Sequence, residues 1–234
     1  MAAGIPYAVD GPREKPAFIP ALLYNPYISQ MVRDGYFYAV PLLGAAALLY
    51  WLAGALWAVF PVLFAAFFLW FFRDPERAIP GAAGAVVSPA DGKVTAVGPV
   101  QADGAQYARI SIFLNVFNVH VNRYPVSGEI EVVHYNPGQF TVASHDKASL
   151  VNEQASVGIL GPHGPVLVRQ IAGNIARRIV TDAGAGDRAV QGERLGMIRF
   201  GSRVDLFLDP AVPIKVALDQ RVVAGQTVLA EFAG

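Results

Sequence analysis

Apolar and polar positions divide the chain into two parts with different patterns. The 38 residues from Gly35 to Phe72 include no Asp, Glu, Lys or Arg. As one helix this segment would extend about 57 Å, nearly twice the thickness of the hydrocarbon core of a bilayer. Two helices of about 18–19 residues would each just span that core, and Gly54 stands near the middle. The pattern predicts a membrane-associated helical hairpin over residues 35–72, preceded by a proline-bearing arm over residues 1–34.

The charges that flank this segment place both of its ends on one side of a membrane. Arg33 precedes it, and Arg73 and Arg77 follow it. Because positive residues mark the cytoplasmic side, we expect the hairpin to hold the chain at the cytoplasmic face of the cell membrane, whether it crosses the bilayer or only dips into it. The alternative is a pair of core helices in a soluble protein, which the uncharged length and three tryptophans make a poorer fit.

The remaining residues, 73–234, show short runs of β-branched and aromatic residues separated by Gly and Pro. Such runs predict strands, here Ala85–Ser88, Lys93–Val97, Ala108–Leu114, Val116–Val121, Glu129–Tyr135, Ala155–Leu160, Val166–Ile171, Met197–Phe200, Val204–Leu208, Ile214–Ala217 and Thr227–Phe232. Helices are plausible over Ser144–Glu153 and Gly173–Val180. Close spacing of short strands favours a compact, barrel-like β domain. The predicted fold class is therefore mainly β (α+β), with the apolar helical hairpin ahead of the β domain.

Composition narrows the range of functions. Hydrophobic residues make up 54% of the chain, and the 18 basic residues balance the 18 acidic ones. No overall field therefore attracts nucleic acid. The chain has no cysteine, which excludes disulfides, thiolate catalysis and Cys-ligated zinc. It has four histidines without the close spacing of a metal motif, so no metal site is predicted.

The stretch Leu195–Leu208 contains the first candidate for chemistry. Its two strand-like runs meet at Gly201–Ser202. A serine hydroxyl next to a glycine carbonyl at a tight bend can attack that carbonyl if a base is near, and Gly201 permits unusual backbone angles. An ordinary Gly-Ser turn in a β hairpin is the alternative, and for the dipeptide alone it is the commoner case.

Two further residues are candidates for an acid–base relay. His120, in FNVHVNRYP, shares one face of a predicted strand with Asn118 and Asn122. Asp91, in SPADGKV, is a carboxylate suited to orient an imidazole. A solvated strand face and a local Asp-Gly turn are the respective alternatives. Lys147 follows a polar turn and belongs to a group of charges that together can meet an anionic headgroup.

Five motifs carry a resemblance to a known family. SPADGKV, FNVHVNRYPVSG, the PGQF…KAS…NE run, VRQIAGNIARRIV and GMIRFGSRVD occur in this order. Together they resemble the short form of phosphatidylserine decarboxylase, over roughly residues 70–234. An apolar hairpin ahead of the catalytic part also fits the family.

This resemblance implies a pyruvoyl enzyme that generates its own cofactor. Ser202 would attack the Gly201 carbonyl, and β-elimination would then cleave the chain into a β chain, 1–201, and an α chain, 202–234, that stay folded together. Ser202 would become a pyruvoyl group, which forms a Schiff base with the serine headgroup and accepts electrons as CO₂ leaves. The implied base is His120, oriented by Asp91. The product would be phosphatidylethanolamine.

Several implications of the resemblance remain open. The phospholipid phosphate or carboxylate would meet Lys147, Arg199 or Arg203. The long form carries a second histidine where this chain has Arg123, and the family's Asn-Glu-Arg ends in Gln154 here. His120 would thus serve both self-cleavage and decarboxylation unless another residue takes one of these roles. A related serine-headgroup lipid is an alternative substrate, and the chain could form homo-oligomers.

Two other classes of protein compete with this interpretation. A membrane-tethered metal hydrolase would use His120 and Asp91, but the other histidines are badly spaced for it. A lipoyl- or biotinyl-carrier domain would share a hammerhead-like β architecture, which SPADGKV and VVAGQTVLAEF resemble. A carrier would need a modified lysine at a hairpin tip, and no Met-Lys or Asp-Lys pair stands at such a tip.

Overall fold

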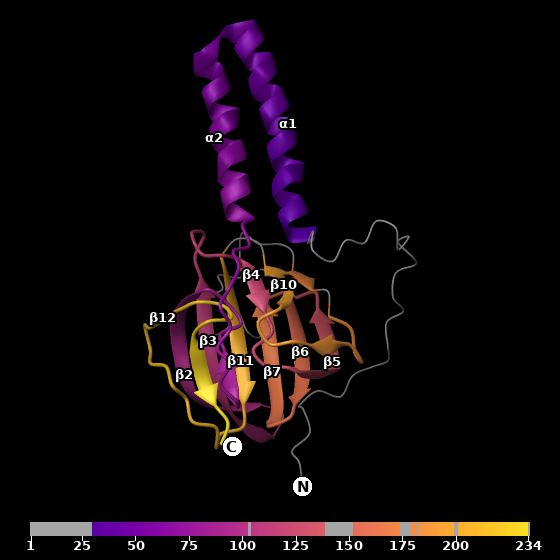
Figure 1. The fold of residues 1–234 in the computed structure, drawn as a ribbon, viewed down its shortest axis with the longest axis vertical. Helices are drawn as coiled ribbons and strands as arrows, with labels where there is room; N and C mark the ends of the chain where they lie inside the picture. The colour runs from indigo at the N-terminus through magenta and orange to yellow at the C-terminus, as the bar shows by residue number, and fades with distance from the viewer. Residues whose placement is uncertain are drawn as a thin grey trace. The chain divides into compact units, whose positions relative to one another are not determined.

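The computed structural model describes residues 30–102, 104–138, 152–173, 179–181, 183–198 and 201–233. Its elements are α1 (Gln30–Ala53), α2 (Ala55–Phe71), β1 (Ala85–Val87), β2 (Gly92–Ala102), β3 (Ala105–Leu114), β4 (Val121–Arg123), β5 (Gly128–Asn136), β6 (Gln154–Gly161), β7 (Gly164–Ile171), β8 (Ile179–Thr181), β9 (Arg188–Ala189), β10 (Arg194–Ile198), β11 (Ser202–Leu208), β12 (Arg221–Val222) and β13 (Val228–Glu231). Strands predominate and a helical pair precedes them (Figure 1), which confirms the predicted fold class. The two parts are separate compact units, and the chain passes from one to the other between Pro75 and Glu76.

The helical unit is a hairpin that reverses at Gly54. This residue has φ 88°, a left-handed value that glycine adopts without strain. Tyr38 of α1 stacks on Phe68 and Phe72 at the end of α2, with ring centroids 4.9 and 5.8 Å apart. Large apolar side chains along both helices are exposed, among them Trp51 at 80%. The helix from Asp34 to Ala53 is long and apolar enough to cross a membrane, whereas α2 is shorter.

The β unit is built on an eight-stranded sheet in the order β12-β2-β3-β11-β7-β6-β5-β9. Figure 1 shows that this sheet curls rather than lying flat. A three-stranded sheet, β4-β10-β8, and a two-stranded sheet, β1-β13, complete the unit. Val204 and Leu206 of β11 pack in one core cluster with Ile198 of β10 and Val86 of β1. The main core thus includes side chains from all three sheets.

Strand β11 occupies a central position in the eight-stranded sheet. It pairs with β3 from Ser202 opposite Leu114 to Leu208 opposite Ala108, and with β7 on its other side. All seven of its residues are buried. Its side chains alternate between the two faces, so Ser202 shares the core face with Val204, whereas Arg203 lies on the opposite face.

Local hydrogen bonds correct one of the predicted strands. Residues 116–118 form a turn, and strand structure resumes only at Val121. The Asn118 side chain accepts a bond from Asn115 N at 2.9 Å, and the Asn115 side chain accepts one from Phe117 N at 2.8 Å. Asparagine side chains that bond to nearby backbone groups in this way favour turns over strands. The predicted strand Val116–Val121 is therefore wrong over most of its length.

Tertiary pairing corrects other predicted elements. Ile179 and Val180, expected at the end of a helix, instead lie in β8 and pair with β10. The predicted strand Ile214–Ala217 reduces to a single bridge between Ile214 and Ala230. Of the predicted helix Ser144–Glu153, only Asn152 and Glu153 lie within the described residues, and neither is helical.

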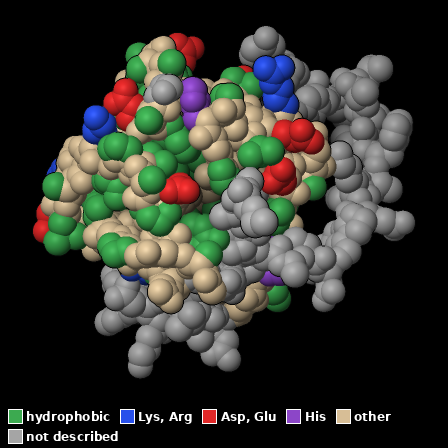
Figure 2. Space-filling model, turned by 90° about the horizontal axis from the view of Figure 1, so that it is seen from below, with side chains coloured by type: hydrophobic (Ala, Val, Ile, Leu, Met, Phe, Trp, Pro, Cys, Tyr) green, Lys and Arg blue, Asp and Glu red, His purple; other side chains and the backbone are tan. Residues whose placement is uncertain are grey.

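Figure 2 shows the charged side chains on one face of the molecule. On this face, the basic and acidic side chains of the described residues occur singly or in small groups, with no extended patch of one sign.

Candidate active site

The Gly201–Ser202 bond lies where the chain passes from one sheet to another. β10, which ends at Ile198, pairs with β4 and β8. β11, which begins at Ser202, pairs with β3 and β7. The two strands are therefore not hairpin partners, and the ordinary hairpin turn considered as the alternative is wrong. Because β10 and β11 share no ladder, breaking the bond between Gly201 and Ser202 removes no pairing between them.

The backbone and side chain at this crossing are unusual for a turn. Gly201 has φ 56°, in the left-handed region, and a Cβ added there would meet no atom of the described residues within 4 Å. Ser202 is fully buried, and its Oγ has no hydrogen-bond partner in the part of the chain that the structure describes. Buried hydroxyls are normally paired, and an exception calls for an explanation such as catalysis. Among the described residues, the hydroxyl therefore has no hydrogen-bond partner and the adjacent glycine has no close neighbour.

Strand pairing brings His120 to the same end of the β unit. Its backbone oxygen accepts a hydrogen bond from Ile198 N at 3.3 Å, at the end of β10 from which the chain crosses to Ser202. Its side chain is fully buried, and Nδ1 lies 2.9 Å from the Asn118 carbonyl oxygen. A carbonyl can only accept, so Nδ1 carries the proton and Nε2 of the neutral ring keeps the lone pair. With a neutral ring, this contact gives His120 the tautomer that a general base requires.

Asp91 has hydrogen-bond partners of its own. Its carboxylate accepts bonds from Arg77 at 2.9 and 3.1 Å and from Ala224 N at 2.8 Å. The turn that carries it contacts the far end of β4, because Pro89 O accepts a bond from Arg123 N at 2.9 Å. That position is about 10 Å along the strand from His120. The Asn118 carbonyl contacts the imidazole, and the orienting role of Asp91 stays a prediction.

Of the three residues suggested for substrate contacts, the structure describes one. Lys147 and Arg199 lie outside the described residues. Arg203 is 3% exposed and forms an ion pair with the fully buried Asp205, with a shortest N–O distance of 2.9 Å. It faces away from the side of β11 that carries Ser202. This ion pair gives Arg203 a structural partner, and its contact with a phosphate stays a prediction.

Several buried polar residues near this end of the sheets make contacts that the sequence did not reveal. Asn152 Nδ2 donates to Ala172 O at 2.7 Å. Glu153 Oε1 accepts from the Tyr135 hydroxyl at 2.8 Å and from Ile179 N at 3.2 Å. These two residues therefore link β5, the end of β7 and β8 by hydrogen bonds, close to β11. The signal in the sequence is the Asn-Glu pair directly before a predicted strand. In the structure both residues are buried.

A second polar cluster joins the eight-stranded and three-stranded sheets. Gln170 of β7 donates from Nε2 to Asn122 Oδ1 of β4 at 2.8 Å, and Thr181 of β8 donates from its hydroxyl to Gln170 Oε1 at 3.0 Å. Asn122 and Gln170 are both fully buried. We call this set the polar floor. The sequence indicated only that Asn122 shares a strand face with His120.

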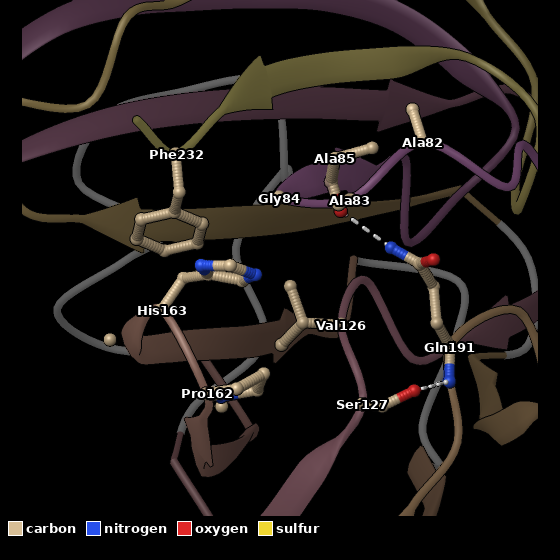
Figure 3. A pocket seen from close by; sticks show the side chains of 12 residues that line it. Ala82, Ala83, Gly84, Ala85, Val126, Ser127, Pro162, His163, Gln191 and Phe232 are labelled. Carbon is tan, nitrogen blue, oxygen red and sulfur yellow. Dashed lines mark hydrogen bonds between the residues drawn. The ribbon is translucent and has the colours of Figure 1, made fainter. Parts of the chain in front are cut away.

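A cavity of about 180 Å³ lies elsewhere in the β unit (Figure 3). His163 and Phe232 stack at one side of it, with centroids 6.0 Å apart, and Gln191 bonds to Ala85 O at the other. The cavity includes the turn between β6 and β7, whereas Ser202 lies beyond the opposite end of β7. The length of β7, about 25 Å, separates them. This cavity is therefore not part of the candidate site.

The described residues contain no group of three or more His, Asp or Glu side chains that could hold a metal ion.

The comparisons with known proteins point to one family. A model of the phosphatidylserine decarboxylase family matches residues 64–230. A phosphatidylserine decarboxylase proenzyme of Solibacter usitatus is 51% identical over 201 residues, which cover 86% of this chain and 96% of the relative. The proenzyme of Nitrosomonas europaea is 46% identical over 205 residues, with coverage of 86% and 95%.

Proposed function

The chain belongs to the phosphatidylserine decarboxylase family, and on this premise we propose that it cleaves itself between Gly201 and Ser202 and then decarboxylates phosphatidylserine at a membrane surface. The single observation that carries the proposal is the uncommitted, buried hydroxyl of Ser202 at a crossing between two sheets. The name proenzyme, printed for the relatives, agrees with a precursor that is processed.

The cleavage follows from the groups at the crossing. The Oγ of Ser202 forms a bond to the Gly201 carbonyl carbon while its proton passes to Nε2 of His120. The C–N bond then breaks, the nitrogen takes a proton, and an ester replaces the amide. Loss of the Ser202 Cα proton expels the Gly201 carboxylate and leaves a dehydroalanine, which water converts to a keto group with release of ammonia. His120 is suited to these proton transfers because its Nε2 carries the lone pair.

The environment of Ser202 fits the group that this chemistry would produce. The position is fully buried and faces the apolar core, where water competes little with a bound headgroup. A pyruvoyl group at this position would supply an electron sink for the electrons of the bond to CO₂. His120 is the described residue best placed to return a proton to the product carbon.

The state of the purified chain tests the proposal. We expect intact-mass analysis and denaturing electrophoresis to show two fragments, residues 1–201 and 202–234, with the smaller lacking a free amine. Under native conditions they should stay together, because β11 lies between β3 and β7, and β13 pairs with β1. A fully active chain that remains whole would refute the proposal.

Action at a membrane surface is supported by two features. A diacyl lipid leaves the bilayer only at a cost of about 0.8 kcal/mol for each buried CH₂, so the enzyme must reach the headgroup at the interface. The helical hairpin supplies exposed apolar side chains suited to the bilayer, and its flanking arginines favour the cytoplasmic face. In the β unit, the turn that directly follows Leu114, the partner of Ser202, presents Phe117 at 72% exposure.

We expect Phe117→Ser to raise the apparent KM for phosphatidylserine in vesicles about tenfold, since burial of a large apolar side chain contributes about 1.5–3 kcal/mol. Turnover of a short-chain, monomeric serine phospholipid and the extent of self-cleavage should be unchanged. Leu160→Ser is the matched control, because Leu160 is 45% exposed at the opposite end of the sheet. Equal effects of the two substitutions, or equal effects on both substrates, would contradict a membrane contact at Phe117.

A further inference from the structure

The polar floor of Asn122, Gln170 and Thr181 is not explained by the stability of the core. Buried amides are usually fully hydrogen-bonded, because an unpaired buried donor is costly. Asn122 is fully buried, yet its Nδ2 has no hydrogen-bond partner among the residues that the structure describes. An unsatisfied donor in this position indicates a group that is held ready for an acceptor.

Strand register places this donor next to the reacting groups. Asn122 lies opposite Gly196 in β10. The backbone of His120, two residues earlier and just before β4 begins, bonds to Ile198, so it lies closer to the end of β10 that leads to Ser202. In the eight-stranded sheet, Gln170 lies opposite Val204, and Ser202 likewise lies one layer closer to that end. The spacing of such layers is about 7 Å. Along the chain, Asn122 therefore lies two residues from His120, and Gln170 lies opposite Val204, two residues from Ser202.

The hydrogen bonds also fix which way the amides face. The Thr181 hydroxyl lies 3.0 Å from Gln170 Oε1 and, at a longer 3.4 Å, from Leu195 O, and both of these oxygens accept. With Oε1 accepting, Gln170 Nε2 is the end that donates to Asn122 Oδ1. The remaining end of Asn122 is the NH₂ group. The chain of contacts thus presents two N–H donors with a defined orientation.

We infer that Asn122 Nδ2 hydrogen-bonds the Gly201 carbonyl oxygen as negative charge develops on it, and that Gln170 and Thr181 position Asn122 for this task. The inference rests on the proposed self-cleavage. When Ser202 Oγ bonds to the Gly201 carbon, the π electrons of the C=O bond move to oxygen and the hydroxyl proton moves to His120. A fixed donor in a buried site stabilises that oxyanion without reorganisation. When the C–N bond breaks, the electrons return and the ester carbonyl forms.

The test follows self-cleavage of the full chain, made by cell-free translation, over time on denaturing gels. Asn122→Asp keeps the shape and replaces the donors with a negative acceptor, so cleavage should slow at least 100-fold. Thr181→Val removes the hydroxyl at similar volume and should slow cleavage about tenfold, whereas Thr181→Ser should cleave within twofold of wild type. Ser111→Ala is the matched control, because Ser111 is a buried serine of the same sheet on the face opposite Ser202. It should cleave normally.

The outcomes separate this inference from the proposed function. A wild-type chain that is never cleaved would refute the proposed function itself. A wild-type chain that cleaves, with Asn122→Asp cleaving equally fast, would overturn only the role of Asn122. If Asn122→Asp does not fold, as judged by circular dichroism, the two Thr181 variants carry the test. Equal rates for Thr181→Val and Thr181→Ser would then overturn the inference, because only the serine keeps the hydroxyl that orients Gln170.

Discussion

Replacing Ser202 with alanine is expected to leave a single 25.0 kDa chain without decarboxylase activity. The hydroxyl is the nucleophile of the proposed cleavage, and its elimination from residue 202 gives the dehydroalanine from which the keto group forms, so its loss stops both processing and catalysis. The fold should be unaffected, because Ser202 Oγ forms no hydrogen bond to any residue in the described ranges. Alanine removes a buried hydroxyl without breaking a bond, and such changes cost little. Intact mass, an assay of CO₂ release and a thermal melt measure the three effects.

The control for this substitution is a second serine of the same sheet. Ser111→Ala also removes a buried hydroxyl, but from β3 on the opposite face. It should be cleaved and active. If Ser202→Ala were still cleaved after residue 201, another nucleophile would have to act, and the mechanism proposed above would be wrong. If it were whole but fully active, the keto group would not be required.

His120→Gln is expected to slow self-cleavage by a factor of about 10²–10⁴, the usual contribution of a general base. Glutamine keeps a polar side chain of similar reach but has no lone-pair nitrogen to accept the Ser202 proton. The backbone contact from Ile198 N to residue 120 does not depend on the side chain, so β4 and β10 should remain paired. A time course of fragment appearance after synthesis gives the rate.

His163→Gln is the matched control for His120. His163 lies at the turn between β6 and β7 and stacks on Phe232, at the far end of β7 from Ser202. It should leave the cleavage rate unchanged within about twofold. Normal cleavage of His120→Gln would remove His120 from the role of base, and equal slowing in both variants would point to a general loss of stability instead.

The apolar hairpin and most strands of the β unit are predictable from local sequence. A long uncharged segment with a glycine near its middle can hardly form anything but two apolar helices, and α1 and α2 do meet at Gly54. The alternating or continuous apolar runs of β3, β6, β7 and β11 likewise predict strands. The turn at Asn115–Asn118 was not predicted. Its apolar neighbours favour a strand, and the two hydrogen bonds from backbone N–H groups to asparagine side chains are not evident from the sequence.

The arrangement of the candidate site was less accessible to sequence reasoning. Ser202 and His120 were recognised from motifs, but which strands pair is decided by contacts between distant segments. The sequence therefore could not show that β10 and β11 belong to different sheets. Nor could it show that Arg203 is matched by Asp205 two residues later, or that Asp91 is held by Arg77. Both pairings depend on burial, which sequence alone does not give.

The crossing between the two sheets also has a thermodynamic consequence for the mature enzyme. A cut at this point would leave a native assembly of two polypeptides whose unfolding releases them as independent solutes. The unfolded side then gains translational entropy that a single chain lacks, and stability becomes dependent on protein concentration, as in obligate dimers. The precursor can refold as one molecule, whereas the processed pair has to find each other again. If the chain folds before it is cleaved, the two fragments reach their native assembly without having to associate from solution.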